Sequence, residues 1–178
     1  MKYICVFCGS RTGINPNYEQ TASNLGKMIA QKGLGIVYGA GKSGLMGAVA
    51  KAALTAGGQV VGVIPDFLSS QEPTYSGLTK LHIVDSMHER KALMAKLADA
   101  FIILPGGYGT LEEFCEILTW AQLALHQKPI ILLNINGYYD PLLKFFDQAV
   151  QEKFLLPQYR SLVQEVTSLE ELRPLIKN

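Results

Sequence analysis

The stretch AFIILPGGYGTLEE, residues 100–113, joins an apolar run to a glycine-rich turn that leads into a helical pattern. The run Ala100–Leu104 has the length and composition of a buried strand, and the apolar spacing after it predicts a helix over Leu111–Leu125. Strands this apolar are typical of a parallel sheet that is covered by helices on both faces. The stretch therefore predicts one strand–helix unit of an α/β domain.

The same alternation of apolar runs and helical patterns extends over the rest of the chain. It predicts further strands at Tyr3–Cys8, Leu34–Tyr38, Gln59–Ile64, Lys80–Val84, Pro129–Asn134 and, with a weaker pattern, Leu162–Val166. It predicts further helices at Pro16–Gln31, Gly44–Ala56, Met87–Leu97, Tyr139–Glu152 and a short one after Ser168. We expect a doubly wound, mostly parallel, Rossmann-like sheet of about six or seven strands with helices on both faces. No linker divides the chain, so residues 1–178 are expected to form a single domain.

The composition argues against several classes of partner. Sixteen basic and fifteen acidic residues give a formal net charge of +1, so the chain has no excess positive charge with which to bind nucleic acid. No apolar run reaches the roughly eighteen residues that a membrane span needs, so we expect no membrane partner. An odd count of three cysteines favours a cytoplasmic protein over a secreted one with a disulfide framework.

Neither the cysteines nor the histidines form a pattern typical of a redox or metal site. Cys5 and Cys8 have the spacing of a redox pair, but they lie in the first β-patterned run, so we expect buried structural thiols. His82, His88 and His126 are scattered singly, and the sequence predicts no metal site.

In a doubly wound sheet, ligands bind beyond the carboxyl ends of the strands. The first five of these ends are predicted at Gly9-Ser10, Gly39–Gly41, Pro65-Asp66, Asp85-Ser86 and Pro105–Thr110. Two of the five are glycine-rich turns that lead into helices, where backbone N–H groups and the helix dipole can approach an anion. The sequence therefore predicts a ligand that bears phosphate.

The first glycine-rich turn leaves a second class of function open. Gly39-x-Gly41-x-x-Gly44 fits the fingerprint of dinucleotide binding, and Asp66 follows some twenty residues later, as in NAD(P)-dependent oxidoreductases. However, the fingerprint normally follows the first strand of the fold, and here it follows the second. The chain also lacks an evident hydride-transfer partner or catalytic domain, which makes this alternative the weaker one.

The second glycine-rich turn, at Pro105–Thr110, carries more information. Thr110 and Glu113 fit a capping box, with Thr110 as the N-cap of the following helix and Glu113 in its first turn. The helix dipole favours the charged form of a carboxylate in that position, so Glu113 is expected to be anionic near neutral pH. Three glycines also allow the main chain to press against a phosphate, which helix capping alone does not require.

A charged cluster, SMHERK at Ser86–Lys91, opens the helix after the fourth predicted strand. By local pattern alone it also fits a solvated helix face. Arg90 offers a planar fork of donors for phosphate or ribose oxygens, and Lys91 adds a point charge. We expect this cluster on the same edge of the sheet as the second glycine-rich turn, one strand away.

These two segments together resemble the LOG ("lonely guy") family of cytokinin riboside 5′-monophosphate phosphoribohydrolases. The resemblance rests on MHERK at Met87–Lys91 and PGGxGTxxE at Pro105–Glu113. Further similar blocks are Val6–Ser10, Gly44–Gly47, Leu97–Ala100, Thr119–Gln122 and Gly137–Leu143. The resemblance implies hydrolysis of a purine nucleoside 5′-monophosphate, or of its prenylated cytokinin form, to the free base and ribose 5-phosphate. It further implies a homodimer, and we expect neither a cofactor nor a metal.

The resemblance also assigns residues to the site. It places the paired catalytic residues at Arg90 and Glu113. It implies substrate contacts from Glu72, Lys91, Gly107, Tyr108, Gly109, Thr110, Leu111, Glu112 and Thr119. The residues after Glu72 are Pro73-Thr74-Tyr75, where the family usually carries a histidine, so the contacts to the base are not assigned.

The predicted reaction requires negative charge beside the sugar, because loss of an N-linked base passes through an oxocarbenium-like transition state. Glu113 is expected to supply that charge and to position the attacking water. No residue stands out as the acid that protonates the departing base, and the pattern does not separate AMP from a cytokinin nucleotide. A nucleotide-binding module without catalysis remains an alternative. Members of the family have also been labelled lysine decarboxylases, but no lysine here is a convincing cofactor anchor, and the chain is short for a pyridoxal enzyme.

Overall fold

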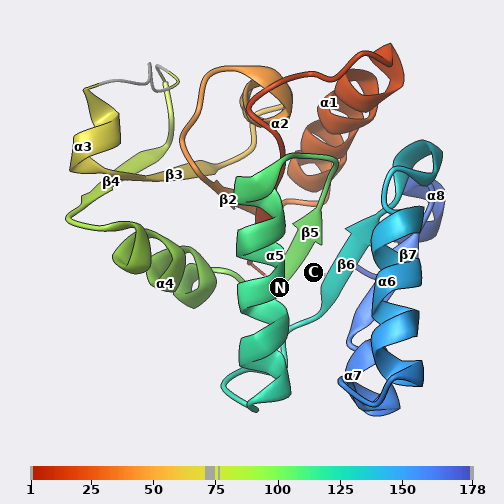
Figure 1. The fold of residues 1–178 in the computed structure, drawn as a ribbon. Helices are drawn as coiled ribbons and strands as arrows, with labels where there is room; N and C mark the ends of the chain where they lie inside the picture. The colour runs from red at the N-terminus through yellow and green to blue at the C-terminus, as the bar shows by residue number, and fades with distance from the viewer. Residues whose placement is uncertain (1, 71–74, 76, 177–178) are drawn as a thin grey trace.

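The computed structural model describes residues 2–70, 75 and 77–176, and its centre is a seven-stranded parallel sheet (Figure 1). The strands are β1 (Tyr3–Phe7), β2 (Gly35–Tyr38), β3 (Val60–Pro65), β4 (Lys80–Val84), β5 (Ala100–Ile103), β6 (Ile130–Leu133) and β7 (Val163–Val166). Their order is β4-β3-β2-β1-β5-β6-β7. The direction of winding therefore reverses between β1 and β5, which confirms the doubly wound α/β fold.

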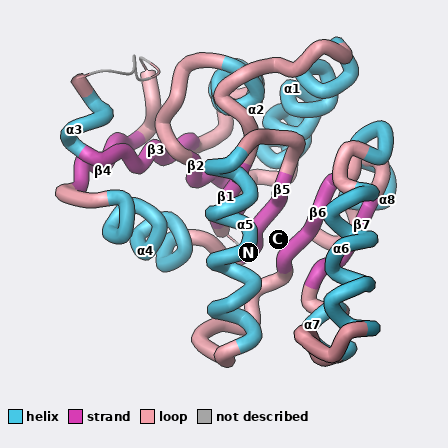
Figure 2. Tube along the Cα trace, viewed as in Figure 1, coloured by secondary structure: helices cyan, strands magenta, loops and turns pink. Residues whose placement is uncertain are grey.

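Helices cover both faces of the sheet because the central strands are apolar on both sides (Figure 2). In β1, Ile4 and Val6 enter one core cluster, and Cys5 and Phe7 enter the other. The first cluster packs under α1 (Pro16–Gln31), α2 (Gly44–Thr55) and α8 (Leu169–Leu172). The second packs under α4 (Met87–Leu97), α5 (Tyr108–Gln122) and α6 (Asp140–Gln151). The core thus forms two layers that hold the strand ends in fixed positions.

The predicted elements agree with the structure in type, and three short elements were not predicted. The latter are α3 (Asp66–Ser69), the 3-10 turn η1 (Ile135–Gly137) and α7 (Pro157–Arg160). Segments this short carry less than two turns of apolar periodicity, so their sequences give no helical signal. No helix among the described residues is long and apolar enough to cross a membrane.

The prediction for α5 was wrong at both ends, and the error changes the interpretation of Glu113. The helix begins at Tyr108, with Gly107 as its N-cap, and not at Leu111. Thr110 is therefore the third helical residue and not the N-cap, and the predicted capping box with Glu113 does not form. The helix ends at Gln122, because Ala124 turns into the left-handed region with φ 57°.

The expected placement of the charged cluster one strand from the second glycine-rich turn was also wrong. Three strands, β3, β2 and β1, separate β4 from β5 in the sheet. α4 nevertheless crosses beneath them on its way to β5 and packs on all three. The crossover helix therefore brings Arg90 and Lys91 of the cluster to α5, where they pair with Glu113 and with Glu112 and Glu116, respectively.

Candidate functional site

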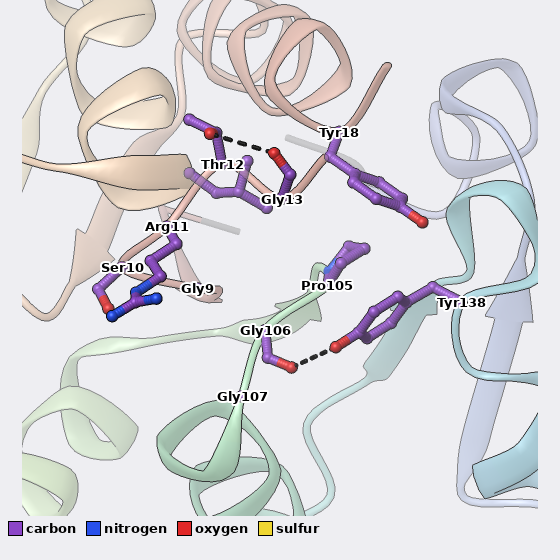
Figure 3. A pocket seen from close by; sticks show the side chains of 11 residues that line it. Gly9, Ser10, Arg11, Thr12, Gly13, Tyr18, Pro105, Gly106, Gly107 and Tyr138 are labelled. Carbon is purple, nitrogen blue, oxygen red and sulfur yellow. Dashed lines mark hydrogen bonds between the residues drawn. The ribbon is translucent and has the colours of Figure 1, made fainter. Parts of the chain in front are cut away.

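The candidate site lies at the point where the winding of the sheet reverses. The loops after β1 and β5 meet there, and the backbone N–H of Gly9 donates to the carbonyl oxygen of Pro105 at 3.0 Å. Figure 3 shows the loop Gly9–Gly13 facing Pro105–Gly107 across a cavity. This crevice between the two central strands is where doubly wound folds bind their ligands.

The N-terminus of α5 forms one wall of the site. Within the described residues, no side chain accepts a hydrogen bond at its N-cap, Gly107, so the N–H groups of the first turn keep their capacity to bind an anion. A Cβ atom at Gly107 or Gly109 would meet no protein atom within 4 Å, so packing within the described residues does not require glycine there. A Cβ at Gly106, in contrast, would overlap the side chain of Thr110. The turn is thus shaped by one glycine and left open to a ligand at the other two.

A cavity of about 270 Å³ lies against this wall and contains the two residues predicted to be catalytic. Its lining is formed by Cys8, Gly9, Ser10, Gly39, Met46, Ile64, Leu68, Arg90, Gly107, Tyr108, Gly109, Thr110 and Glu113. The apolar part, with Met46, Ile64 and Leu68, suits a flat base, whereas the polar part suits a phosphorylated sugar.

Arg90 is fixed in the cavity by both its helix and the sheet. Ser86 caps α4 by accepting the N–H of Glu89, and the Glu89 carboxylate accepts the N–H of Asp85, which fixes the first turn. The Arg90 Nε donates to the carbonyl oxygen of Val63 on β3 at 3.2 Å. A Cβ at Gly39 would overlap the Arg90 Nη2, so the guanidinium can occupy this position only because residue 39 is glycine.

Glu113 faces Arg90 in a largely buried environment. The Arg90 Nη1 lies 3.5 Å from the Glu113 Oε1, and Glu113 is only 8% exposed. Burial raises the pKa of Glu113 to about 7, although the positive charge of Arg90 acts in the opposite direction. The prediction that the helix dipole keeps this carboxyl anionic near neutral pH was therefore wrong, because Glu113 lies beyond the first turn and desolvation dominates.

Lys91 pairs with residues other than Glu113, although it is the next residue after Arg90. It is 7% exposed, and its ammonium forms ion pairs with Glu112 and, at 3.1 Å, with Glu116. Among the described residues, the lining of the cavity includes neither Lys91 nor Glu112. These two predicted substrate contacts therefore bind each other and do not join Arg90 and Glu113 in the lining of the cavity.

The remaining predicted contacts fall into four groups. Gly107, Tyr108, Gly109 and Thr110 line the cavity, with Tyr108 almost fully exposed at 93%. Leu111 packs against the core cluster beneath α5. Thr119 lies six residues beyond Glu113, about 9 Å along the helix axis, and lines a different groove between α5 and α6. Glu72 lies outside the described residues.

Sequence reasoning missed several residues of the site. Cys8, Met46, Ile64 and Leu68 line the cavity, and their apolar character gave no signal beyond that of core residues. A second cavity of about 330 Å³ adjoins the first, because Gly9, Ser10 and Gly107 line both. Tyr18 and Tyr138 line it and pack edge to face, with ring centroids 5.8 Å apart, and the Tyr138 hydroxyl donates to the carbonyl oxygen of Gly106 at 2.7 Å (Figure 3). That bond gives the turn at Gly106 a second side-chain contact besides Thr110.

Comparison with known proteins gives consistent matches over most of the chain. A family model described as "Possible lysine decarboxylase" matches residues 46–176. The cytokinin riboside 5′-monophosphate phosphoribohydrolase of Rhodococcoides fascians is 53% identical over 163 residues, covering 91% of this chain and 82% of that protein. The cytokinin riboside 5′-monophosphate phosphoribohydrolase LOG of Oryza sativa subsp. japonica is 48% identical over 169 residues, covering 95% of this chain and 70% of that protein.

Solved structures also match, at lower identity. A molybdenum cofactor binding protein from Rippkaea orientalis superimposes with a TM-score of 0.73 at 23% identity, covering 98% of this chain and 94% of that one. The Moco carrier protein from Chlamydomonas reinhardtii gives a TM-score of 0.73 at 22% identity, with the same coverage of both chains. These likenesses concern the fold alone.

Proposed function

The chain belongs to the LOG family of cytokinin riboside 5′-monophosphate phosphoribohydrolases, and on this premise we propose that it hydrolyses the N-glycosidic bond of a purine or cytokinin nucleoside 5′-monophosphate. The products are the free base and ribose 5-phosphate. The observation that carries the proposal for the site is the pairing of Arg90 with Glu113 in a cavity whose wall is the N-terminus of α5.

In this proposal the phosphate and the sugar occupy different parts of the cavity. The N–H groups at the start of α5 bind the 5′-phosphate, since the positive end of the helix dipole lies there and Gly107 permits close approach. The guanidinium of Arg90 donates to phosphate or ribose oxygens. Binding energy from the phosphate thereby fixes the ribose against Glu113.

Glu113 supplies the chemistry at the anomeric carbon. Its carboxylate stabilises the positive charge that develops on the sugar as the bond to the base breaks, and it accepts a proton from the attacking water. A pKa of about 7 suits this role, because a general base works best when its pKa is close to the operating pH. Burial, the same property that raises the pKa, also strengthens the interaction of the carboxylate with the cationic sugar.

Incubation of the purified protein with AMP and with prenylated AMP tests the proposed activity. Chromatography should show release of the free base together with an equal amount of ribose 5-phosphate. Tight nucleotide binding without base release from either substrate would instead identify a non-catalytic nucleotide-binding module. Bound NAD(P) with hydride transfer would identify an oxidoreductase that uses the glycine-rich turn after β2.

The geometry of Lys91 opposes a pyridoxal-dependent lysine decarboxylase. A lysine that anchors pyridoxal phosphate must react as the neutral amine. Burial alone lowers the pKa of Lys91, but its hydrogen bonds to Glu112 and Glu116 and their negative charges raise the pKa overall. Lys91, the buried lysine of the described residues, therefore stays protonated and is poorly suited to that chemistry.

The pH dependence of kcat/KM should report the ionisation of Glu113. The group is protonated below its pKa of about 7 and ionised above it, so kcat/KM for AMP should rise as the pH increases through that region. The substrate phosphate also loses its second proton near pH 6, which adds a second pH-dependent step to the profile of kcat/KM that does not come from the enzyme. A profile already at its plateau at pH 5 would contradict the assigned role of Glu113.

Gly39→Ala should impair turnover without unfolding the protein. The added Cβ overlaps the flexible end of Arg90, so the guanidinium must move while the backbone keeps its place. We expect kcat/KM to fall by about ten- to a hundredfold, because small displacements of catalytic groups carry penalties of that order. Thermal unfolding should show a nearly unchanged Tm, and unchanged kinetics would show that the position of Arg90 is unimportant.

We further propose a cytoplasmic homodimer that forms through the groove between α5 and α6. The groove is lined by apolar side chains such as Leu118, Phe146 and Phe154, and Phe154 is 89% exposed in the single chain. Exposed apolar surface of this kind marks interaction sites. Sedimentation of the wild type and of Phe154→Asp should give a dimer and a monomer, respectively.

The cytoplasmic location is supported by the cysteines, because Cys5, Cys8 and Cys115 are all unpaired thiols.

A further inference from the structure

Lys91, a buried lysine, links the two helices that carry the candidate catalytic pair. It lies on α4 directly after Arg90, and its partners Glu112 and Glu116 lie on α5 on either side of Glu113 in sequence. A charge removed from water is costly unless it is paired, so a lysine that is 7% exposed requires these carboxylates. The link therefore fixes the separation and register of α4 and α5 at the level of the cavity.

We propose that Lys91 is a positioning residue: by binding Glu112 and Glu116 it holds Arg90 opposite Glu113 and neutralises two carboxylates on the helix that carries Glu113. This inference rests on the proposed function and deepens it. It assigns Lys91 a role that acts through Glu113 rather than through contact with the nucleotide.

Several charged or titratable groups act on Glu113, and Lys91 supplies one of the two positive charges among them. Arg90 and Lys91 approach from α4, and Glu112 and Glu116 belong to α5 itself. From β1 and its end come the thiols of Cys5 and Cys8, whose pKa values are raised by burial, so both stay neutral. With Lys91 in place, two positive charges oppose two negative ones around the Glu113 carboxyl. Without it, Arg90 alone opposes Glu112 and Glu116, so protonated Glu113 becomes favoured.

The first test measures the pKa of Glu113 directly in Lys91→Met. A pH titration of the Glu side-chain carboxyl signals by ¹³C NMR, with Glu113 assigned from Glu113→Gln, follows this ionisation in the absence of any substrate. We expect the pKa of Glu113 to rise by about one unit relative to the wild type, the usual effect of removing an opposite charge at this range. The acidic limb of kcat/KM for AMP should move upward by the same amount.

Matched variants separate neutralisation from substrate binding. Glu116→Gln removes one of the two like charges, so alone it should lower the pKa of Glu113, and combined with Lys91→Met it should move the pKa back toward the wild-type value. Lys91→Arg keeps the charge and should leave the pKa of Glu113 close to that of the wild type. If Lys91 contacted the phosphate instead, Lys91→Met would raise the KM for AMP without changing the pKa of Glu113. Adding Glu116→Gln would then not restore the wild-type KM.

The outcome is decisive even where one variant fails. Should Lys91→Met not fold, Glu116→Gln alone still carries the test, and an unchanged pKa of Glu113 in that variant overturns the proposal. Because NMR requires no turnover, an inactive wild type would refute the proposed reaction while leaving the link between Lys91 and Glu113 measurable. An unchanged pKa of Glu113 in folded Lys91→Met would refute the positioning role in an active enzyme.

Discussion

Glu113→Gln should lower kcat for release of the base from AMP by about 10²- to 10⁴-fold, the range that a general base contributes. The substitution keeps the shape of the side chain but removes its ability to carry negative charge and to accept a proton. The substitution should change the stability of the folded protein little. The wild-type carboxyl is largely buried, and desolvation already favours its neutral form, which the neutral amide resembles. Nucleotide binding should persist, since the N–H groups of α5 are unaffected.

Glu152→Gln provides the matched control for that experiment. Glu152 is exposed at the C-terminal end of α6, outside the cavity, and its substitution should leave kcat and KM unchanged. Circular dichroism and equilibrium binding of AMP should be similar for both variants and the wild type. Near-normal turnover by Glu113→Gln would show that the carboxylate does not take part in the reaction.

Arg90→Ala should damage both binding and turnover and lower kcat/KM for AMP by about a hundredfold or more, the effect typical of a lost charged donor in an enclosed site. Two physical effects act together. The substrate loses a bidentate donor, and Glu113 loses the positive charge that lowers its pKa. The acidic limb of the pH profile should therefore move upward, a change that loss of binding alone does not produce.

Arg173→Ala is the control for that substitution. Arg173 is exposed at the C-terminal end of α8, and among the described residues it lines neither the cavity nor the groove between α5 and α6. We expect its kinetics to match those of the wild type. Arg90→Ala with wild-type kcat and KM would instead make Arg90 a structural residue that happens to lie in the cavity.

The strands and the long helices were predictable because each carries a strong local signal. The central strands are apolar on both sides, and the predicted strand ends that carry Gly9 and Gly106 do meet at one edge of the sheet. The loop residues of the site followed from that geometry. The apolar residues of the cavity did not, because Met46 and Ile64 have the same sequence pattern as residues of the core.

The start of α5 shows where local pattern failed. The spacing of a small hydroxyl residue and a glutamate three positions later occurs several times in the sequence, and three of these pairs are Ser86–Glu89, Thr110–Glu113 and Ser168–Glu171. The first and third pairs form the predicted type of cap, with the serine accepting the glutamate N–H. The Thr110 pair does not form such a cap, because the helix already begins at Tyr108 and its N-cap residue is Gly107. A capping motif thus predicts a helix start only where no earlier residue can begin the helix.

The electrostatics of the site could not be predicted from local sequence. The helix dipole argued for an ionised Glu113, but the opposing term, desolvation under α4, depends on a crossover that the sequence does not reveal. The role of Lys91 could not be predicted from local sequence either. Its place beside Arg90 suggested a second phosphate ligand, whereas its environment is set by Glu112 and Glu116, more than twenty residues away in the chain.

A crystal structure of the slow variant Glu113→Gln with AMP would show where the phosphate and the ribose lie. We expect the 5′-phosphate on the backbone N–H groups of Tyr108 to Thr110. We also expect the anomeric carbon within about 3.5 Å of the residue 113 side chain, either directly or through one water molecule. An AMP molecule whose ribose lies away from residue 113, or whose phosphate lies away from the start of α5, would contradict the proposed site.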